Sequence, residues 1–194
     1  NDVAFGALLK VLRETDDPRS PGNKLIDNTL VIFTSDNGPN VGDNNAPNQE
    51  SGGLRGKKAK IWEGGHRVPF ILYWKGIFEG GQINRNLFSL TDLFATLAHA
   101  VGEELAPAEA QDSLDSLAYW KDSGKSDLRE RYFFCHLGPP YGNDAIAVRK
   151  GSKKLIVQGG LARPWAEFGT RGSAKPVILY DLKENPHEQG DFSN

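Results

Sequence analysis

The stretch LVIFTSDNGPN, residues 30–40, decides how this chain is interpreted. An uncharged run from Leu30 to Thr34 ends abruptly in Ser-Asp-Asn-Gly-Pro. Such a run is typical of a strand that is buried on both faces, as strands of parallel sheets are. Asp-Asn-Gly-Pro is also ordinary turn chemistry. The stretch is therefore either a plain turn after a strand, or a strand that delivers Asp36 and Asn37 to a site.

The second interpretation has a chemical basis. Ligands of open parallel sheets bind beyond the carboxyl ends of the strands, and Asp36 and Asn37 follow such an end. Neighbouring residues of a strand face opposite sides, so both side chains reach one site only if the backbone leaves strand geometry. The following Gly38-Pro39 allows that change. Carboxylate and amide oxygens are the ligands that calcium or magnesium prefers.

Composition narrows the class of protein. The chain has 194 residues, of which 38% are hydrophobic and 25% charged, as in folded domains. The formal net charge of -2 gives no general attraction to nucleic acid, and no apolar run is long enough to span a membrane. The single cysteine, Cys135, excludes an internal disulfide. The absence of methionine predicts a processed product or a part of a longer chain.

Hydrophobic periodicity predicts two parts of the chain. The first part has a helix over 3–13, strands over 29–34 and 68–74 and, after a capping box at Ser89, a helix over 93–101, with a long loop over 38–53. This order favours an α/β layer architecture. The second part has short alternating strands that predict a small antiparallel sheet. These strands cover 131–136, 145–150, 153–158 and 176–182. The predicted division is 1–117 and 118–194.

A basic segment precedes the second predicted strand. Residues 53–74 are GLRGKKAKIWEGGHRVPFILYW. Its lysines are suited to an anionic group, because lysine is a compact charge that needs no fixed bidentate geometry. The alternative is a solvated loop. Gly64 and Gly65 are predicted to supply positive φ angles at the entrance to the strand. Glu63 and Arg67 are predicted to pair with each other or with neighbours.

Four segments, in order, resemble the sulfatase family. TSDNGP and LRGKKAKIWEGGHRVPFILYW match its S-D-N-G turn and its L-R-G-x-K-x-x-x-x-E-G-G-x-R-x-P element. SLTDLFATLAHAVG and LYDLKENPHEQGDF resemble its S-x-x-D-L helix and its closing L-Y-D-L strand and turn. The resemblance implies the C-terminal part of an alkaline-phosphatase-like α/β sandwich, a mostly parallel sheet flanked by helices. A small antiparallel sheet subdomain follows it.

The resemblance also implies roles for particular residues. Asp36 and Asn37 fall on the positions that bind the active-site calcium, and Lys58 falls on the catalytic lysine that contacts the substrate sulfate. His66 stands where the pattern has no fixed residue, and is either a contact at the substrate rim or a bystander. The remaining matches are predicted to be structural. They are Gly38, Glu63, Gly64, Gly65, Arg67 and Pro69.

One departure from the family limits the prediction. Sulfatases use a formylglycine nucleophile made from a C/S-x-P-S-R motif, and this sequence has no such motif. Cys135, in FFCHLGPP, does not fit it and is predicted to be a small apolar strand residue. We therefore expect a C-terminal segment of a calcium-assisted sulfatase whose nucleophile lies upstream. Alone, the chain is expected to be inactive and to bind calcium weakly or not at all.

Partners follow from the same resemblance. We expect a sulfated small molecule or glycan as substrate, and association with the missing N-terminal part or with a second copy. The family suggests a periplasmic, secreted or lysosomal location. Two alternatives stay open: a phosphate-ester hydrolase of the same superfamily, and a non-catalytic module that binds sulfated glycans through Lys57, Lys58 and Lys60.

Overall fold

The computed structural model describes residues 2–42, 47–122, 133–137, 145–158 and 177–190, and for 133–137 and residue 158 the backbone only. The helices are α1 (Asp2–Glu14), α2 (Glu63–His66), α3 (Leu93–Ala100) and α4 (Leu117–Lys121), with 3-10 turns at Leu25–Asn28, Gln49–Ser51 and Leu90–Asp92. The strands are β1 (Val31–Thr34), β2 (Phe70–Tyr73), β3 (Phe133–Leu137), β4 (Ala145–Lys150), β5 (Lys153–Gln158) and β6 (Val177–Asp181). No helix in the described ranges has the length and hydrophobicity to cross a membrane.

The first part of the chain is built on the ribbon of β1 and β2. These strands pair antiparallel, with Val31 opposite Tyr73 and Thr34 opposite Phe70. The apolar run predicted a strand that is buried on both faces. That prediction is wrong, because only Val31 of β1 is buried, and Ile71 and Tyr73 of β2 are exposed. The described residues provide no further strand beside this ribbon, so its side chains have few neighbours.

Helices α1 and α3 form as predicted. Helix α1 contacts the ribbon through the rings of Phe5 and Phe33, whose centroids lie 4.9 Å apart, and buries none of its residues. Helix α3 follows the capping box at Ser89, whose side chain accepts a hydrogen bond from Thr91 N. The short helix α4 lies outside the predicted helices and strands. It is attached to α3 because the fully buried Thr96 hydroxyl accepts from Ser116 N.

The second part is the predicted antiparallel sheet, in the order β3-β4-β5-β6. Two rows of side chains cross its buried face. Ala147, Ile156 and Ile178 form one row, and Arg149, Lys154 and Tyr180 form the next. Strand β3 includes Cys135, whose side chain lies outside the described residues.

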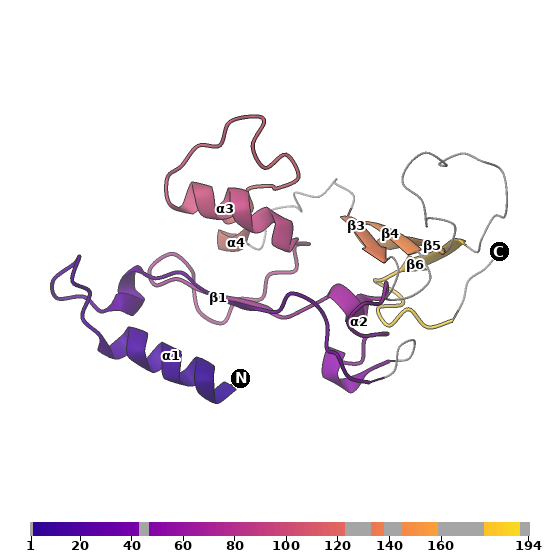
Figure 1. Cartoon of the computed structure of the whole chain (residues 1–194), viewed down its shortest axis with the longest axis horizontal. Helices are drawn as coiled ribbons and strands as arrows, with labels where there is room; N and C mark the ends of the chain where they lie inside the picture. Colours follow the sequence, from indigo (N-terminus) through magenta and orange to yellow (C-terminus); the bar gives the residue numbers. More distant parts are fainter. Residues whose placement is uncertain (1, 43–46, 123–132, 138–144, 159–176, 191–194) are drawn as a thin grey trace.

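The core joins the two parts of the chain. Ile61 and Trp62, which precede α2, are buried with residues of the sheet, and Figure 1 shows α2 between the β1–β2 ribbon and the sheet. The partners from the sheet side are Ala145, Ala147, Ile156, Ile178, Tyr180 and Leu182. The predicted division after residue 117 falls at the first residue of α4 and stays a prediction.

Candidate functional site

The turn after β1 presents Asp36 to solvent. Asp36 is exposed and Asn37 is half-buried. The Ser35 hydroxyl donates to the carbonyl oxygen of Asn37 over 2.8 Å, which bends the backbone immediately after the strand. The chain thus leaves strand geometry at Asp36-Asn37, as the metal-site interpretation requires.

Close backbone packing fixes the position of this turn. The Gly38 N–H donates to the carbonyl oxygen of Gly65 over 2.9 Å. A Cβ atom at Gly38 would lie 1.8 Å from the carbonyl oxygen of Gly64, so only glycine fits. The turn therefore rests directly on α2.

Gly64 and Gly65 serve the same packing. The prediction that they supply positive φ angles is wrong, because both lie within α2 and neither has a positive φ. A Cβ at Gly64 would lie 2.5 Å from the carbonyl oxygens of Arg55 and Gly56, and one at Gly65 would lie 2.0 Å from that of Lys60. Their missing side chains let three segments of backbone approach one another.

The loop of Lys58 lies against the same turn. The Lys58 N–H donates to the carbonyl oxygen of Pro39 over 2.8 Å. A tight turn follows, in which Lys60 N donates to the carbonyl oxygen of Lys57 and Ala59 has a φ of 61°. The Lys58 side chain is exposed, and no ion-pair partner for it occurs among the described residues. The backbone contacts thus bring Lys58 beside Asp36-Asn37 and leave its ammonium group available.

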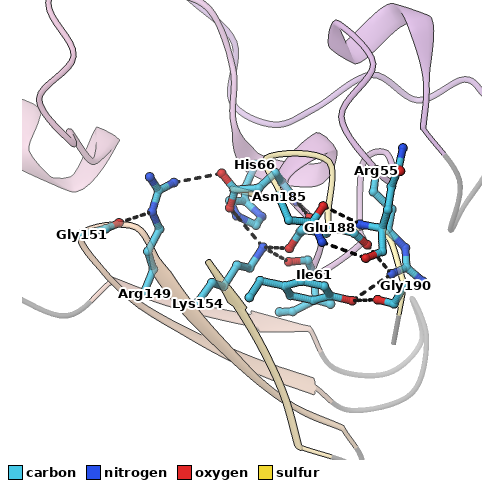
Figure 2. A network of polar contacts seen from close by, with 12 residues as sticks. Arg55, Ile61, His66, Arg149, Gly151, Lys154, Asn185, Glu188 and Gly190 are labelled. Atoms are coloured by element: carbon cyan, nitrogen blue, oxygen red, sulfur yellow. Dashed lines mark hydrogen bonds and ion pairs between the residues drawn. The ribbon is translucent and has the colours of Figure 1, made fainter. Parts of the chain in front are cut away.

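A buried network of charges supports α2 from below (Figure 2). Glu63, Lys154 and Glu188 are essentially inaccessible, with exposures of 0%, 1% and 0%. The Lys154 ammonium lies 3.1 Å from Glu63 Oε1 and 2.7 Å from Glu188 Oε1, and it donates to the carbonyl oxygen of Ile61 over 2.9 Å. Arg149 adds a second cation, 2.9 Å from Glu63 Oε2. Glu63 therefore pairs with neighbours from the sheet.

These contacts keep Glu63 ionised. Burial alone raises the pKa of the Glu63 carboxyl, but the hydrogen bond with His66 and the charges of Lys154, His66 and Arg149 lower it more. The net result is a pKa well below the ordinary value of 4.5. The carboxylate is thus a permanent anion at neutral pH, and it orients the positive groups around it.

The C-terminal turn closes the network. Glu188 Oε2 accepts from the Glu63 N–H over 2.6 Å, at the first turn of α2. Arg55 donates to the carbonyl oxygen of Glu188 over 2.8 Å and to the Tyr180 hydroxyl over 3.1 Å, and its guanidinium lies 3.6 Å from the ring centroid of Trp62. The loop of the predicted sulfate site and the turn around Glu188 are therefore one packed unit.

The other predicted residues lie around α2. His66 Nε2 lies 3.3 Å from Glu63 Oε1, so this ring faces the charge network. The Arg67 N–H donates to the carbonyl oxygen of Glu63 over 2.7 Å and ends the helix. Pro69 directly precedes β2. Figure 2 shows His66 above the sheet residues Arg149 and Lys154.

Asp36 and Asn37 offer oxygen atoms, which is the type of ligand that calcium prefers. Among the residues that the structure describes, the exposed Asp36 carboxylate is contacted by a side chain only at 3.4 Å, from the Ser35 hydroxyl, and so it offers oxygens to a hard cation. Calcium takes about six to eight oxygen ligands. Within the described ranges, no group of three or more His, Cys, Asp or Glu side chains is arranged to hold a metal ion. Asp36 and Asn37 would thus be a part of such a site.

Comparisons with known proteins agree with this arrangement. Residues 22–103 match the sequence profile of the Sulfatase family. Human arylsulfatase A is 32% identical over 206 residues, which cover 96% of this chain and 36% of that protein. Human steryl-sulfatase is 32% identical over 212 residues, which cover 99% of this chain and 34% of that protein.

Solved structures show the same fold. The PsFucS1 sulfatase from Pseudoalteromonas sp. superposes with a TM-score of 0.67 at 29% identity, over 99% of this chain and 36% of that one. The chain therefore belongs to the sulfatase family, and its fold is the C-terminal portion of the alkaline-phosphatase-like α/β fold, followed by a small antiparallel sheet. It spans about one third of the length of these relatives.

Sequence reasoning missed the residues that support the site. Lys154 and Arg149 lie in predicted strands, but nothing in the pattern marks them as partners of Glu63. Glu188 lies in the closing segment that resembles the family, and the sequence pattern implies no role for its side chain. The one available signal in the sequence is the pairing predicted for Glu63, since a buried acidic residue needs a cation nearby.

The close contact at Gly38 generates a first prediction. Gly38→Ala should lower the free energy of unfolding by about 1–3 kcal/mol, because the new methyl group forces the turn away from α2. Urea denaturation measures this. Gly80→Ala is the matched control, since its added Cβ meets nothing within 4 Å, and it should change stability by less than about 0.5 kcal/mol. Equal effects of the two substitutions would contradict the contact.

The ionised Glu63 generates a second. Because its pKa is lowered in the folded state, its stabilisation is fully present above the unfolded pKa and is lost as the pH falls toward the folded pKa. Glu63→Gln should be less stable than the wild type by about 3 kcal/mol at pH 7, and the difference should shrink between about pH 5 and pH 2. Denaturation at a series of pH values tests this. The exposed Glu103→Gln should show no such difference, and a gap for Glu63→Gln that persists at low pH would refute the pKa assignment.

Proposed function

We propose that this chain forms part of the active site of a sulfatase that hydrolyses sulfate esters. The observation that carries the proposal is the pair of backbone hydrogen bonds, Gly38 to Gly65 and Lys58 to Pro39, which join a lysine loop to an acid-amide turn. A cation next to oxygen ligands for a metal is suited to an anionic group such as a sulfate ester. Family membership supports the same reaction.

Each residue has a distinct task in this proposal. The exposed Lys58 ammonium contacts a sulfate oxygen and stabilises negative charge that develops there. Asp36 and Asn37 contribute oxygen ligands to calcium, which when bound would withdraw charge from the sulfate as a Lewis acid. In the overall reaction water adds, the ester S–O bond breaks, and sulfate and an alcohol are released. The formylglycine nucleophile is assigned to a segment other than this one, since the sequence lacks its motif.

A sulfated sugar is the proposed substrate class. One neighbour with the same fold, BT4656, was solved with D-glucosamine-2-N,6-O-disulfate, and another, Ps i-CgsB, with k-i-k-neocarrahexaose. One relative from Bacteroides thetaiotaomicron is an N-acetylgalactosamine-6-O-sulfatase, 32% identical over 88% of this chain and 34% of its own length. The Asn-rich segment after β1 is suited to hydrogen bonding with hydroxyl groups.

The sulfate contact can be tested on the chain itself. Titration with sodium sulfate, followed by NMR of the amides of Gly38 and residue 58, should report binding next to the turn. Lys58→Ala should weaken sulfate binding by about tenfold or more, because it removes a charge-assisted contact. Lys57→Ala, which changes the neighbouring and less exposed lysine, should weaken it by less than about threefold. Equal losses for both variants would indicate a diffuse basic loop and contradict the role of Lys58.

The incomplete ligand set gives another expectation. Isothermal titration of the chain with calcium should show weak binding or none, since Asp36 and Asn37 supply only about three oxygens. A chromogenic aryl sulfate should not be hydrolysed by the purified chain. Turnover would contradict the assignment of the nucleophile to another segment.

A further inference from the structure

The buried Lys154 of the small sheet does more than contribute to the stability of the sheet, because its contacts reach the start of α2. Lys154 is 1% exposed and contacts three groups, namely two carboxylates and the carbonyl oxygen of Ile61. Two of these groups belong to Ile61 and Glu63, on either side of Trp62, the residue that precedes α2. The ammonium group therefore holds the start of α2 at three points, one of them through Glu188 and its bond to Glu63 N.

From α2 the contacts continue to the turn and to the lysine loop. Gly65 accepts from Gly38 N and, in the same helix, Gly64 N donates to the carbonyl oxygen of Arg55 over 2.8 Å. Lys58 N then donates to the carbonyl oxygen of Pro39. These bonds leave little freedom, because a Cβ at Gly38, Gly64 or Gly65 would overlap the opposite backbone. A displacement of α2 must therefore displace the turn and the loop.

We propose that Lys154, assisted by Arg149, is a positioning residue for the sulfate-contacting site and acts through Glu63. The C-terminal sheet then sets the distance between the Asp36-Asn37 turn and Lys58. This inference rests on the proposed function of that site. Arg149 contributes from the same row of the sheet, where it lies opposite Lys154 and binds the second oxygen of the same carboxylate.

The chain offers a matched control within the same strand. Lys153 precedes Lys154 and points to the other face, where its ammonium lies 2.6 Å from the Asp181 carboxylate on the surface. Lys153→Met and Lys154→Met make the same chemical change, and each removes an ion pair with an acidic residue. Only Lys154→Met removes a contact to α2.

The experiment compares native-state NMR spectra of the wild type and the two variants without ligand. Lys154→Met should shift the amide resonances of Gly38, Gly65 and Lys58, and should speed hydrogen exchange at Gly38 and Lys58 by at least about tenfold. Lys153→Met should leave these resonances unchanged. A purely structural role for Lys154 would lower the unfolding midpoint without moving the native-state shifts at Gly38 and Lys58, and that result would overturn the inference.

A milder variant covers the case in which Lys154→Met does not fold. Arg149 is partly exposed and is one of two cations on Glu63, so Arg149→Gln should fold and should shift the same amides in the same direction by less. Unchanged amides in Arg149→Gln would then decide against the proposal.

Sulfate titration distinguishes the positioning role of Lys154 from the proposed sulfatase function on which it rests. If wild-type Gly38 and Lys58 amides do not respond to sulfate, the proposed function fails, whereas the ligand-free comparison still decides whether Lys154 positions the loop. If the wild type responds, Lys154→Met should weaken sulfate binding by about fivefold or more, and Lys153→Met should not.

Discussion

The structure depends on one buried ammonium group. Lys154 has almost no contact with water, and an ion in that position is tolerated only where opposite charges and hydrogen bonds replace its hydration. Glu63 and Glu188 provide them from two segments that are distant in the sequence. Removing one partner of such a group costs about 3–5 kcal/mol, because the remaining charges stay buried without compensation. Because of this penalty, only one relative arrangement of α2, the sheet and the C-terminal turn is stable. Apolar contacts alone would define that arrangement less well.

Above this network the site is made mainly of backbone. Glycines at 38, 64 and 65 allow a strand-end turn, a short helix and a basic loop to approach until carbonyl oxygens and amide groups meet. Because hydrogen bonds of the main chain fix the geometry, the side chains of Asp36 and Lys58 are not needed to hold the fold. They remain exposed, and are available to a metal ion and an anion. Side chains that stabilise the packing, such as Glu63, lie below, and the side chains that we propose to bind metal and sulfate lie above.

Local sequence patterns predicted most of the helices and strands, but they did not predict how the strands β1 and β2 pair or which charged side chains are buried. The helix from Asp2, the capping box at Ser89 and the alternating strands of the second part are local signals, and the structure confirms them. The antiparallel pairing of β1 with β2 could not be predicted, since an apolar run does not contain the direction of its partner. The burial of Lys154 could not be predicted either. In KKLIVQ each face of the strand has one lysine and at least one apolar residue, so the pattern does not show which lysine is buried. Which lysine lies inside depends on a carboxylate more than ninety residues earlier in the chain, Glu63. The metal and sulfate roles came from family resemblance, whereas the packing role of Gly64 and Gly65 required coordinates.

The central claim is that the loop of the proposed sulfate site and the C-terminal sheet form one cooperative unit. Native-state hydrogen exchange of the wild-type chain at low denaturant tests it most directly, since it reports the opening free energy of each amide. The account predicts that the amides of Gly38, Gly64 and Lys58 open with the same free energy as that of Ile156 in the sheet, within about 1 kcal/mol. Opening of the three site amides at a much lower free energy, with the sheet still closed, would contradict it.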